Sequence, residues 1–321
     1  AQGIGLCRTE HMFFNKQRIR SVQKMILSSS NIDRKNAIME LLPYQKNDFY
    51  KILKEMSPSP VTIRLLDPPL HEFLPSQKNT ELINALAKNM NVTVKEIKNR
   101  IIDLFEINPM LGHRGCRLAI SFPEIAEMQV EAIFTACKKL INEGIKPNPE
   151  IMIPLVSTVG EFENQKMVIN KIAKKLNKKF KIKLKYKIGT MIELPRACLT
   201  ADKIAKKADF ISFGTNDLTQ TTFGFSRDDI GSFIQDYFDN NILTEDPFKT
   251  IDQQGVGELV KIAVEKATKS KPKIKIGICG EHGGDPRSIY FFNNINLNYV
   301  SCSPYRSPIA YLAAAKASFR M

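Results

Sequence analysis

The chain alternates short apolar runs with longer segments in which apolar residues recur at helical spacing. Runs of this length bounded by polar or turn residues are typical of buried strands, and the spacing between them is typical of amphipathic helices. Eight strands are predicted, over 3–10, 61–67, 117–121, 150–156, 185–193, 209–214, 275–281 and 298–303. The clearest helices are predicted over 123–142, 159–176, 198–207 and 257–270.

Eight strands alternating with helices predict an α/β fold, a (β/α)8 TIM barrel. A doubly wound open sheet is the alternative that this pattern leaves open. Two long intervals, 15–59 and 70–105, predict mostly helical insertions after the first two strands. A further long connection, 222–257, is expected on the active-site face as a lid or partner contact. We therefore expect one barrel domain spanning residues 1–321.

Composition narrows the class of protein further. A chain of 321 residues with 43% hydrophobic content is long enough for a large α/β domain. It contains no apolar run long enough for a membrane span and no N-terminal signal pattern, so no membrane partner is expected. The six cysteines are scattered without a Cys-x-x-Cys pair, which favours a reducing compartment over a zinc or disulfide framework.

The net charge of +14 raises the question of a nucleic-acid partner. Much of the excess lies in 171–187, where lysines alternate with apolar residues. This segment contains no paired arginines and aromatic residues of the kind that grip bases. A solvated helix face followed by an exposed lead into a strand explains the charge better, and no nucleic-acid partner is expected.

Two carboxylates follow neighbouring strands of the predicted sheet. Glu193 ends the run Gly-Thr-Met-Ile-Glu, and Asp217 follows Ser-Phe-Gly-Thr-Asn. The carboxyl ends of parallel strands meet on one face, which is where barrels hold their active sites. Paired carboxylate oxygens suit Mg²⁺. The sequence therefore predicts a magnesium site formed by Glu193 and Asp217.

Other candidates occupy strand ends on the same face. Arg64 and Arg114 offer forked donors to phosphate or carboxylate, although Arg64 could instead pair with Asp67. Cys279 lies in a glycine-rich stretch with room for a substrate, but a buried cysteine alone is usually inert. Two histidines, at 113 and 282, are expected to serve loop hydrogen bonding rather than catalysis. The set predicts Mg²⁺-assisted chemistry on a small phosphorylated or carboxylated anion.

Seven blocks distributed from one end of the chain to the other carry a family resemblance. They are GLCRTEHMFF from Gly5, RLLDPPLHEFLP from Arg64, NPMLGHRGCRLA from Asn108, IGTMIELPRA from Ile188, SFGTNDLTQTTFGFSRDD from Ser212, GICGEHGGDP from Gly277 and SCSPYRSPIAYLAAAKA from Ser301. Through them the chain resembles the C-terminal phosphoenolpyruvate- and pyruvate-binding barrel of the pyruvate, phosphate dikinase family. That family lies within the superfamily of phosphoenolpyruvate-utilising enzymes.

The resemblance implies roles for individual residues. Glu193 and Asp217 would coordinate Mg²⁺, and Cys279 would be the proton donor at the methylene carbon of phosphoenolpyruvate. The residues that it assigns to substrate binding are Arg64, Arg114, Glu193, Gly214, Thr215, Asn216, Asp217 and Arg227. Tyr311 departs from the family, which would have arginine there.

The resemblance also implies an enzyme that works with further domains. In the family, phosphoryl transfer between phosphoenolpyruvate or the pyruvate enolate and a phosphohistidine is coupled to ATP + phosphate + pyruvate = AMP + diphosphate + phosphoenolpyruvate. The family's carrier histidine follows Thr-Ser, and none of the four histidines here does. Because the chain opens almost inside a strand, we expect residue 1 to lie within a longer polypeptide, with the ATP-binding and phosphohistidine domains upstream.

Partners and alternatives follow from the same resemblance. It implies a homodimer and a phosphotransferase in the cytoplasm, with an organelle left open because a targeting segment would precede residue 1. A phosphoenolpyruvate synthase-type barrel and a non-catalytic dimerisation or regulatory barrel are the alternatives.

Overall fold

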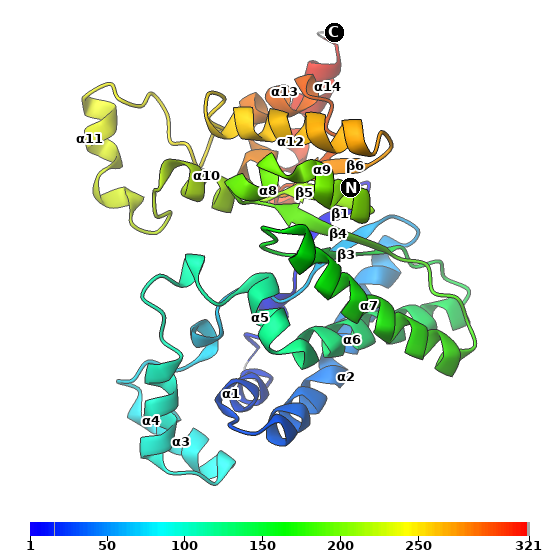
Figure 1. Ribbon diagram of the computed structural model, residues 1–321, viewed down its shortest axis with the longest axis vertical. Coiled ribbons are helices and arrows are strands. Elements are labelled where there is room, and N and C mark those ends of the chain that lie inside the picture. Colours follow the sequence, from blue (N-terminus) through cyan, green and yellow to red (C-terminus); the bar gives the residue numbers. More distant parts are fainter. Residues whose placement is uncertain (16, 320–321) are drawn as a thin grey trace.

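Parallel strands form the centre of the molecule. The computed structural model describes residues 1–15 and 17–319. Within them, seven strands neighbour one another in chain order around a nearly closed barrel (Figure 1). At the seam between the first and last strands, a Cβ added at Gly5 would lie 2.5 Å from the Cβ of Ser301. The strands are β1 (Ile4–Arg8), β2 (Val61–Arg64), β3 (Pro149–Ile153), β4 (Lys187–Ile192), β5 (Phe210–Phe213), β6 (Lys275–Ile278) and β7 (Tyr299–Val300).

Helices cover the outside of the barrel, and successive helices pack against each other. Among these helices are α2 (Asn31–Met56), α6 (Pro123–Asn142), α7 (Val159–Phe180), α9 (Ala201–Lys207), α12 (Val256–Ser270), α13 (Pro286–Asn294) and α14 (Ser307–Ser318). Local sequence fixes their starts. Pro123 opens α6, and Thr158 with Glu161 forms a capping box at the start of α7. The predicted (β/α) barrel architecture is confirmed.

Both predicted insertions are mostly helical, as expected. The first holds α1 (Ile19–Leu27) and α2, and the second holds α3 (Thr80–Met90) and α4 (Val94–Asp103). The α3–α4 pair has its own apolar cluster, which includes Ile83, Leu86 and Ile97. In Figure 1 this pair stands away from the barrel on the side of α1.

The prediction of a strand over 117–121 is wrong. These residues belong to helix α5 (Gly115–Ser121), and β2 pairs directly with β3 through Thr62 and Glu150. No position in the sheet is left between those two strands. A short apolar run does not distinguish a buried strand from one or two turns of helix, because both fit its length. The predicted count of eight strands is therefore corrected to seven in the described part of the chain.

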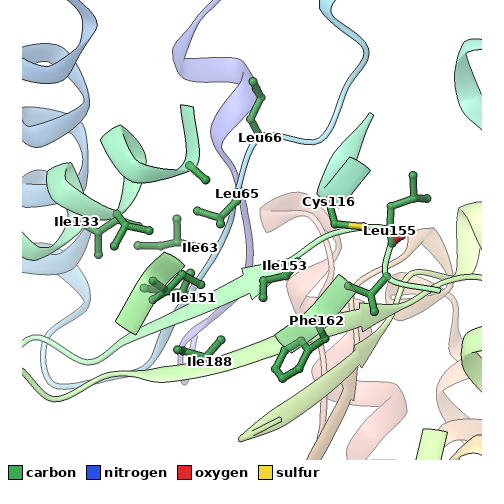
Figure 2. Close-up of a cluster of buried hydrophobic side chains, with 14 of the residues drawn as sticks. Ile63, Leu65, Leu66, Cys116, Ile133, Ile151, Ile153, Leu155, Phe162 and Ile188 are labelled. Carbon is green, nitrogen blue, oxygen red and sulfur yellow. Dashed lines mark hydrogen bonds between the residues drawn. The ribbon is translucent and has the colours of Figure 1, made fainter. Parts of the chain in front are cut away.

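The core lies between the strands and the helices. Ile63, Ile151 and Ile188 occupy neighbouring register positions on β2, β3 and β4 and are fully buried. Figure 2 shows them packed with Leu65, Ile153 and Phe162, and with Cys116 and Leu155 at one end of the cluster. All six cysteines are free. In the described ranges no helix is long and apolar enough to cross a membrane.

The long connection between β5 and β6 is partly ordered by its own aromatic cluster. It follows α10 (Thr215–Phe223) and contains η4 (Ile230–Ser232) and α11 (Ile234–Asp239), which projects from the barrel in Figure 1. Phe225 contacts Phe223, Phe233 and Tyr237. The remaining short helices are α8 (Pro195–Leu199), η1 (Thr9–Met12), η2 (Leu70–Phe73), η3 (Pro109–Leu111), η5 (Glu281–Gly284) and η6 (Pro304–Arg306).

Candidate functional site

A cavity of about 220 Å³ opens at the carboxyl ends of the strands, beside a recess of about 20 Å³. The two share four lining residues, Arg8, Arg64, Asn216 and Asp217, so the recess adjoins the cavity. Cavities of this kind with convergent polar groups are the usual location of small-molecule sites. Many of their lining residues end or follow strands or begin the next helix.

Arginines and carboxylates form a buried network in the cavity wall. Arg64 donates from Nη2 to Glu10 Oε1 (2.5 Å) and pairs through Nη1 with Asp67 Oδ2 (2.8 Å). Arg114 reaches Asp67 Oδ2 at 2.8 Å and Asp217 Oδ1 at 2.9 Å. Although burial alone would favour neutral groups, these pairs raise the pKa of both arginines and lower that of Asp67.

The network bears on the two interpretations of Arg64. Its pairing with Asp67 is confirmed, yet Arg64 also lines both the cavity and the recess. A guanidinium has five N–H donors, so an ion pair leaves others for a ligand. Arg64 Nε has no hydrogen-bond partner and is buried. Pairing and ligand binding are therefore compatible at Arg64.

Glu193 follows β4 and is fully buried at the recess. Its Oε1 accepts a hydrogen bond from the Leu155 amide (2.6 Å), while Oε2 is buried with no partner. Leu155 has φ 58°, so the residue that donates this hydrogen bond to Glu193 is in the left-handed conformation. Burial first, and then the charges of Asp217 and Asp67, raise the pKa of Glu193 to about 8.

Gly214 makes room for that unpartnered oxygen. A Cβ at position 214 would lie 2.4 Å from Glu193 Oε2, so any side chain there would displace the carboxylate. An unpartnered carboxylate oxygen in a buried site is costly unless a ligand satisfies it. Glu193, with Asp217 as its neighbour, is therefore the position best suited to hold a cation. No group of three or more histidine, cysteine or acidic side chains is arranged around a metal position in the chain as described.

Residues 214–217 begin α10, and they do not all face the cavity. Asn216 and Asp217 line both the cavity and the recess, and Gly214 lines the recess. Thr215 is fully buried and bonded through Oγ1 to His282 Nδ1 (2.7 Å). The structure thus brings three of these four residues to the cavity or recess and places Thr215 behind them.

Cys279 directly follows β6 and lies at the recess, where only 6% of it is exposed. Its Sγ donates to the Phe213 carbonyl at 3.5 Å, and its apolar neighbours include Met152, Met191 and Phe210. Burial raises the pKa of Cys279 to about 11. The thiol therefore carries its proton at neutral pH and suits a proton donor better than a nucleophile.

The outer cavity is lined by residues from the long connection. Arg227 and Asp228 lie in its wall, and Arg227 Nη2 is 3.9 Å from Glu281 Oε1. Both of these side chains are close to half exposed, so the pair is weak and Arg227 is free to reorient. Arg227 is thus brought to the same cavity as Arg64 and Arg114.

Both histidines make hydrogen bonds, as expected from the sequence. His113 contacts Ser121 Oγ through Nε2 (2.9 Å), outside the cavity. His282 is fully buried and bonded on both ring nitrogens. Neither lines the cavity or the recess.

The cavity has four further lining residues that were not predicted for the site: Arg8, Glu10, Asp67 and Glu72. A usable signal existed for the first three. They end or follow β1 and β2 in the same way that Glu193 follows β4. Glu72 lies on η2, inside an insertion, where position relative to a strand gives no such signal.

The sequence of the chain is similar to a family of known proteins. A sequence profile described as "PEP-utilising enzyme, PEP-binding domain" matches residues 1–319. The chain is 56% identical over 317 residues to a chloroplastic pyruvate, phosphate dikinase of Flaveria trinervia. That match covers 98% of the chain and 33% of the relative. It is 54% identical over 319 residues to the pyruvate, phosphate dikinase of Clostridium symbiosum, covering 99% and 36%. The chain thus spans about a third of the length of these relatives.

Proposed function

The chain belongs to the PEP-utilising enzymes through their PEP-binding domain, and on this premise we propose that it carries the phosphoenolpyruvate and pyruvate half of the pyruvate, phosphate dikinase reaction. The observation that carries the proposal is the convergence of Arg64, Arg114, Glu193, Asp217 and Cys279 on one cavity and its recess. The rest of the reaction, from ATP and phosphate to a phosphohistidine, is assigned to domains outside this chain.

In this proposal Glu193 and Asp217 hold Mg²⁺. Two observations support the fit: Glu193 Oε2 lacks a partner, and the Asp217 charge raises the pKa of Glu193. A divalent cation removes that repulsion and favours two ionised carboxylates. When bound, Mg²⁺ supplies Lewis-acid stabilisation of the negative charge on an enolate oxygen.

The chain's own residues carry out the remaining steps. Arg64 and Arg114 bind the phosphoryl and enolate oxygens, and their carboxylate partners keep them oriented before substrate arrives. Asn216 is a neutral donor in the same wall. Cys279 holds a proton on Sγ and delivers it to C3 of the enolate as the phosphoryl group leaves, and accepts it back in the opposite direction. Arg227 approaches the phosphoryl group from the cavity mouth.

Partners and location are part of the proposal. The anionic substrate is phosphoenolpyruvate or pyruvate, and the phosphoryl acceptor is a histidine on another domain of the full enzyme. A homodimer is proposed, and the cytoplasm is the proposed compartment, although the plant relatives are named as chloroplastic. By itself the chain is expected not to turn over ATP.

The experiment that tests the function is a calorimetric titration of the chain with oxalate, a planar mimic of the pyruvate enolate. With Mg²⁺ we expect saturable binding that disappears without the metal and weakens about 1,000-fold, or about 4 kcal/mol, in Glu193→Ala and Asp217→Ala. Asp229→Ala is the matched control, because this exposed carboxylate lies outside the cavity. Folded wild-type chain that binds no oxalate with Mg²⁺ would contradict the function and favour a non-catalytic barrel.

A further inference from the structure

His282 joins two loops of the site from behind. It lies on η5 and is fully buried, and both of its ring nitrogens have partners. Nδ1 lies 2.7 Å from Thr215 Oγ1, and Nε2 lies 2.9 Å from the Pro247 carbonyl oxygen. The ring thus spans from the start of α10 to the far end of the long connection.

The partners determine the protonation of the ring. A carbonyl oxygen only accepts, so Nε2 must carry a hydrogen and donate to Pro247. Burial lowers the pKa of His282, which favours the neutral ring. Nδ1 of a neutral ring with hydrogen on Nε2 is an acceptor, so the Thr215 hydroxyl donates to it. Each of the two bonds has one defined direction.

Further contacts join the same two loops. The Glu281 amide donates to Asn216 Oδ1 at 3.2 Å. A Cβ at Gly280 would lie 2.0 Å from Thr215 Oγ1, so the loop after β6 rests directly on Thr215. Thr215 is followed at once by Asn216 and Asp217, and Gly280 follows Cys279. The bond between His282 and Thr215 therefore joins the loop that carries Asp217 to the loop that carries Cys279.

The bond to Pro247 has a separate consequence. Pro247 lies near the end of the connection that carries Arg227 and Asp228 into the cavity wall. A second bond, from the Ile251 amide to Ser288 Oγ (3.0 Å), holds the same end of that connection without touching Thr215. Arg287, beside Ser288 on α13, also bonds Glu245 and Thr250 Oγ1 (2.9 Å). Among these bonds to the end of the connection, the one from His282 also reaches Thr215.

We infer that His282 is a positioning residue that fixes Asn216 and Asp217 against Cys279 through Thr215, and fixes the long connection through Pro247. Its binding consequence rests on the proposed function. Its structural consequence, restraint of both loops, does not.

Two substitutions separate the two bonds. The amide atoms of asparagine are two bonds from Cβ, as Nδ1 is, so His282→Asn keeps an acceptor for Thr215 and loses the bond to Pro247. The amide atoms of glutamine are three bonds from Cβ, as Nε2 is, so His282→Gln keeps a donor for Pro247 and loses the bond to Thr215. We expect the oxalate Kd with Mg²⁺ to rise about tenfold in His282→Gln and less than threefold in His282→Asn.

Matched variants complete the cycle. Thr215→Val removes the hydroxyl that donates to His282, and should also raise the Kd about tenfold. The double variant Thr215→Val with His282→Gln should have an oxalate Kd no higher than that of either single variant, because each single substitution already removes the same bond. Thr62→Val is the control. It removes an equally buried hydroxyl, bonded to Glu150 Oε2 (2.9 Å) at the opposite end of the barrel, and should leave the Kd unchanged.

Hydrogen exchange makes the inference testable without any ligand. Amides in 215–219 should exchange faster in Thr215→Val and His282→Gln than in Thr62→Val, and amides in 244–250 should exchange faster in His282→Asn. Failure of the wild-type chain to bind oxalate would count against the proposed function. Amide hydrogen exchange in the variants would still test whether His282 restrains the two loops. Unchanged exchange in both segments, or Kd increases in the two His282 variants that merely follow their losses in thermal stability, would overturn the inference.

Discussion

Two fully buried glutamates lie at opposite ends of the barrel and are treated differently by their surroundings. Glu150, at the amino ends of the strands, accepts from Thr62 and pairs with Lys275 (2.8 Å) and Lys187 (3.3 Å). Burial opposes its ionisation, but these partners outweigh burial and lower its pKa. Glu193, at the carboxyl ends, has one unpartnered oxygen and a pKa raised to about 8.

The difference separates a structural from a functional carboxylate. Burial alone does not distinguish the two, and neither does residue type. What distinguishes them is whether the protein itself satisfies the charge. At Glu150 it does, and the side chain lines neither the cavity nor the recess. At Glu193 it does not, and the side chain faces the recess. A buried group left unsatisfied next to a cavity indicates a site that a ligand completes.

The largest expected effect is on binding at the carboxyl end. Glu193→Gln keeps an acceptor for Leu155 but removes the charge, so the Mg²⁺-dependent oxalate Kd should rise about 1,000-fold, or about 4 kcal/mol. The free energy of unfolding at pH 7 should rise rather than fall, because no ion pair is lost and glutamine needs no proton on folding, whereas Glu193 does. Calorimetry and urea unfolding of the same preparation give both numbers. If Glu193→Gln instead lost much of its stability while the folded variant still bound oxalate, Glu193 would be a structural residue.

The same substitution at the amino end of the barrel should have the opposite outcome, a loss of stability without a loss of oxalate binding. Glu150→Gln leaves Lys275 beside the rings of Phe210 and Tyr299 without its carboxylate. We expect a loss of about 3 kcal/mol in unfolding free energy, the lower part of the range for broken buried pairs, since Lys275 is about a quarter exposed. Oxalate binding should persist. Glu163→Gln, which breaks an exposed pair with Lys207, is the control and should cost less than about 1 kcal/mol.

The two glutamates should also give opposite pH dependences of stability. Because the folded pKa of Glu193 lies above its ordinary value of 4.5, the folded state holds a proton that the unfolded chain releases. Its contribution is therefore complete below about pH 4.5 and is lost as pH rises toward 8, by at most about 1.4 kcal/mol per pH unit. Glu150, with a lowered pKa, contributes stability that is lost as pH falls below 4.5.

Melting temperatures of wild type, Glu193→Gln and Glu150→Gln between pH 4 and 9 separate the two contributions. Relative to Glu193→Gln, wild type should lose stability between pH 5 and 8, and Mg²⁺ should reduce that loss. Parallel curves for these two proteins would show that Glu193 titrates normally.

The smallest expected effect concerns the thiol. Cys279→Ala removes a proton donor but no metal ligand, so the oxalate Kd should change less than about threefold. Because its pKa is raised to about 11, alkylation at Cys279 should be slow at pH 7 and accelerate up to pH 10. Peptide mapping gives the rate, and oxalate with Mg²⁺ should protect Cys279 but not the half-buried Cys302. Rapid alkylation of Cys279 at pH 7 would contradict its role as a protonated donor.

The sequence predicts the site better than it predicts the contacts inside it. Glu193, Asp217, Arg64 and Cys279 come together because parallel strands bring their carboxyl ends to one face, and strand ends are visible in the apolar pattern. The bridging of Arg64 and Arg114 by Asp67 is not visible in this way. It depends on side-chain directions across the second insertion, since Asp67 and Arg114 lie 47 positions apart.

Two other features needed the folded chain. Thr215 was assigned to substrate binding with its neighbours, but the first turn of α10 directs it toward His282. The run 117–121 was predicted as a strand, but a five-residue apolar pattern fits a short helix equally well. The direct pairing of β2 with β3 decides between them, and that pairing joins residues almost 90 positions apart.

The most direct test of the account counts protons during binding. At pH 7 a carboxyl group with a pKa near 8 is mostly protonated, and binding of Mg²⁺ and oxalate must ionise it. Calorimetric titration in two buffers of different ionisation enthalpy should show release of nearly one proton at pH 7 and almost none at pH 9.5. Binding at pH 7 without proton release would contradict the claim that Glu193 is the unsatisfied carboxylate that the ligand completes.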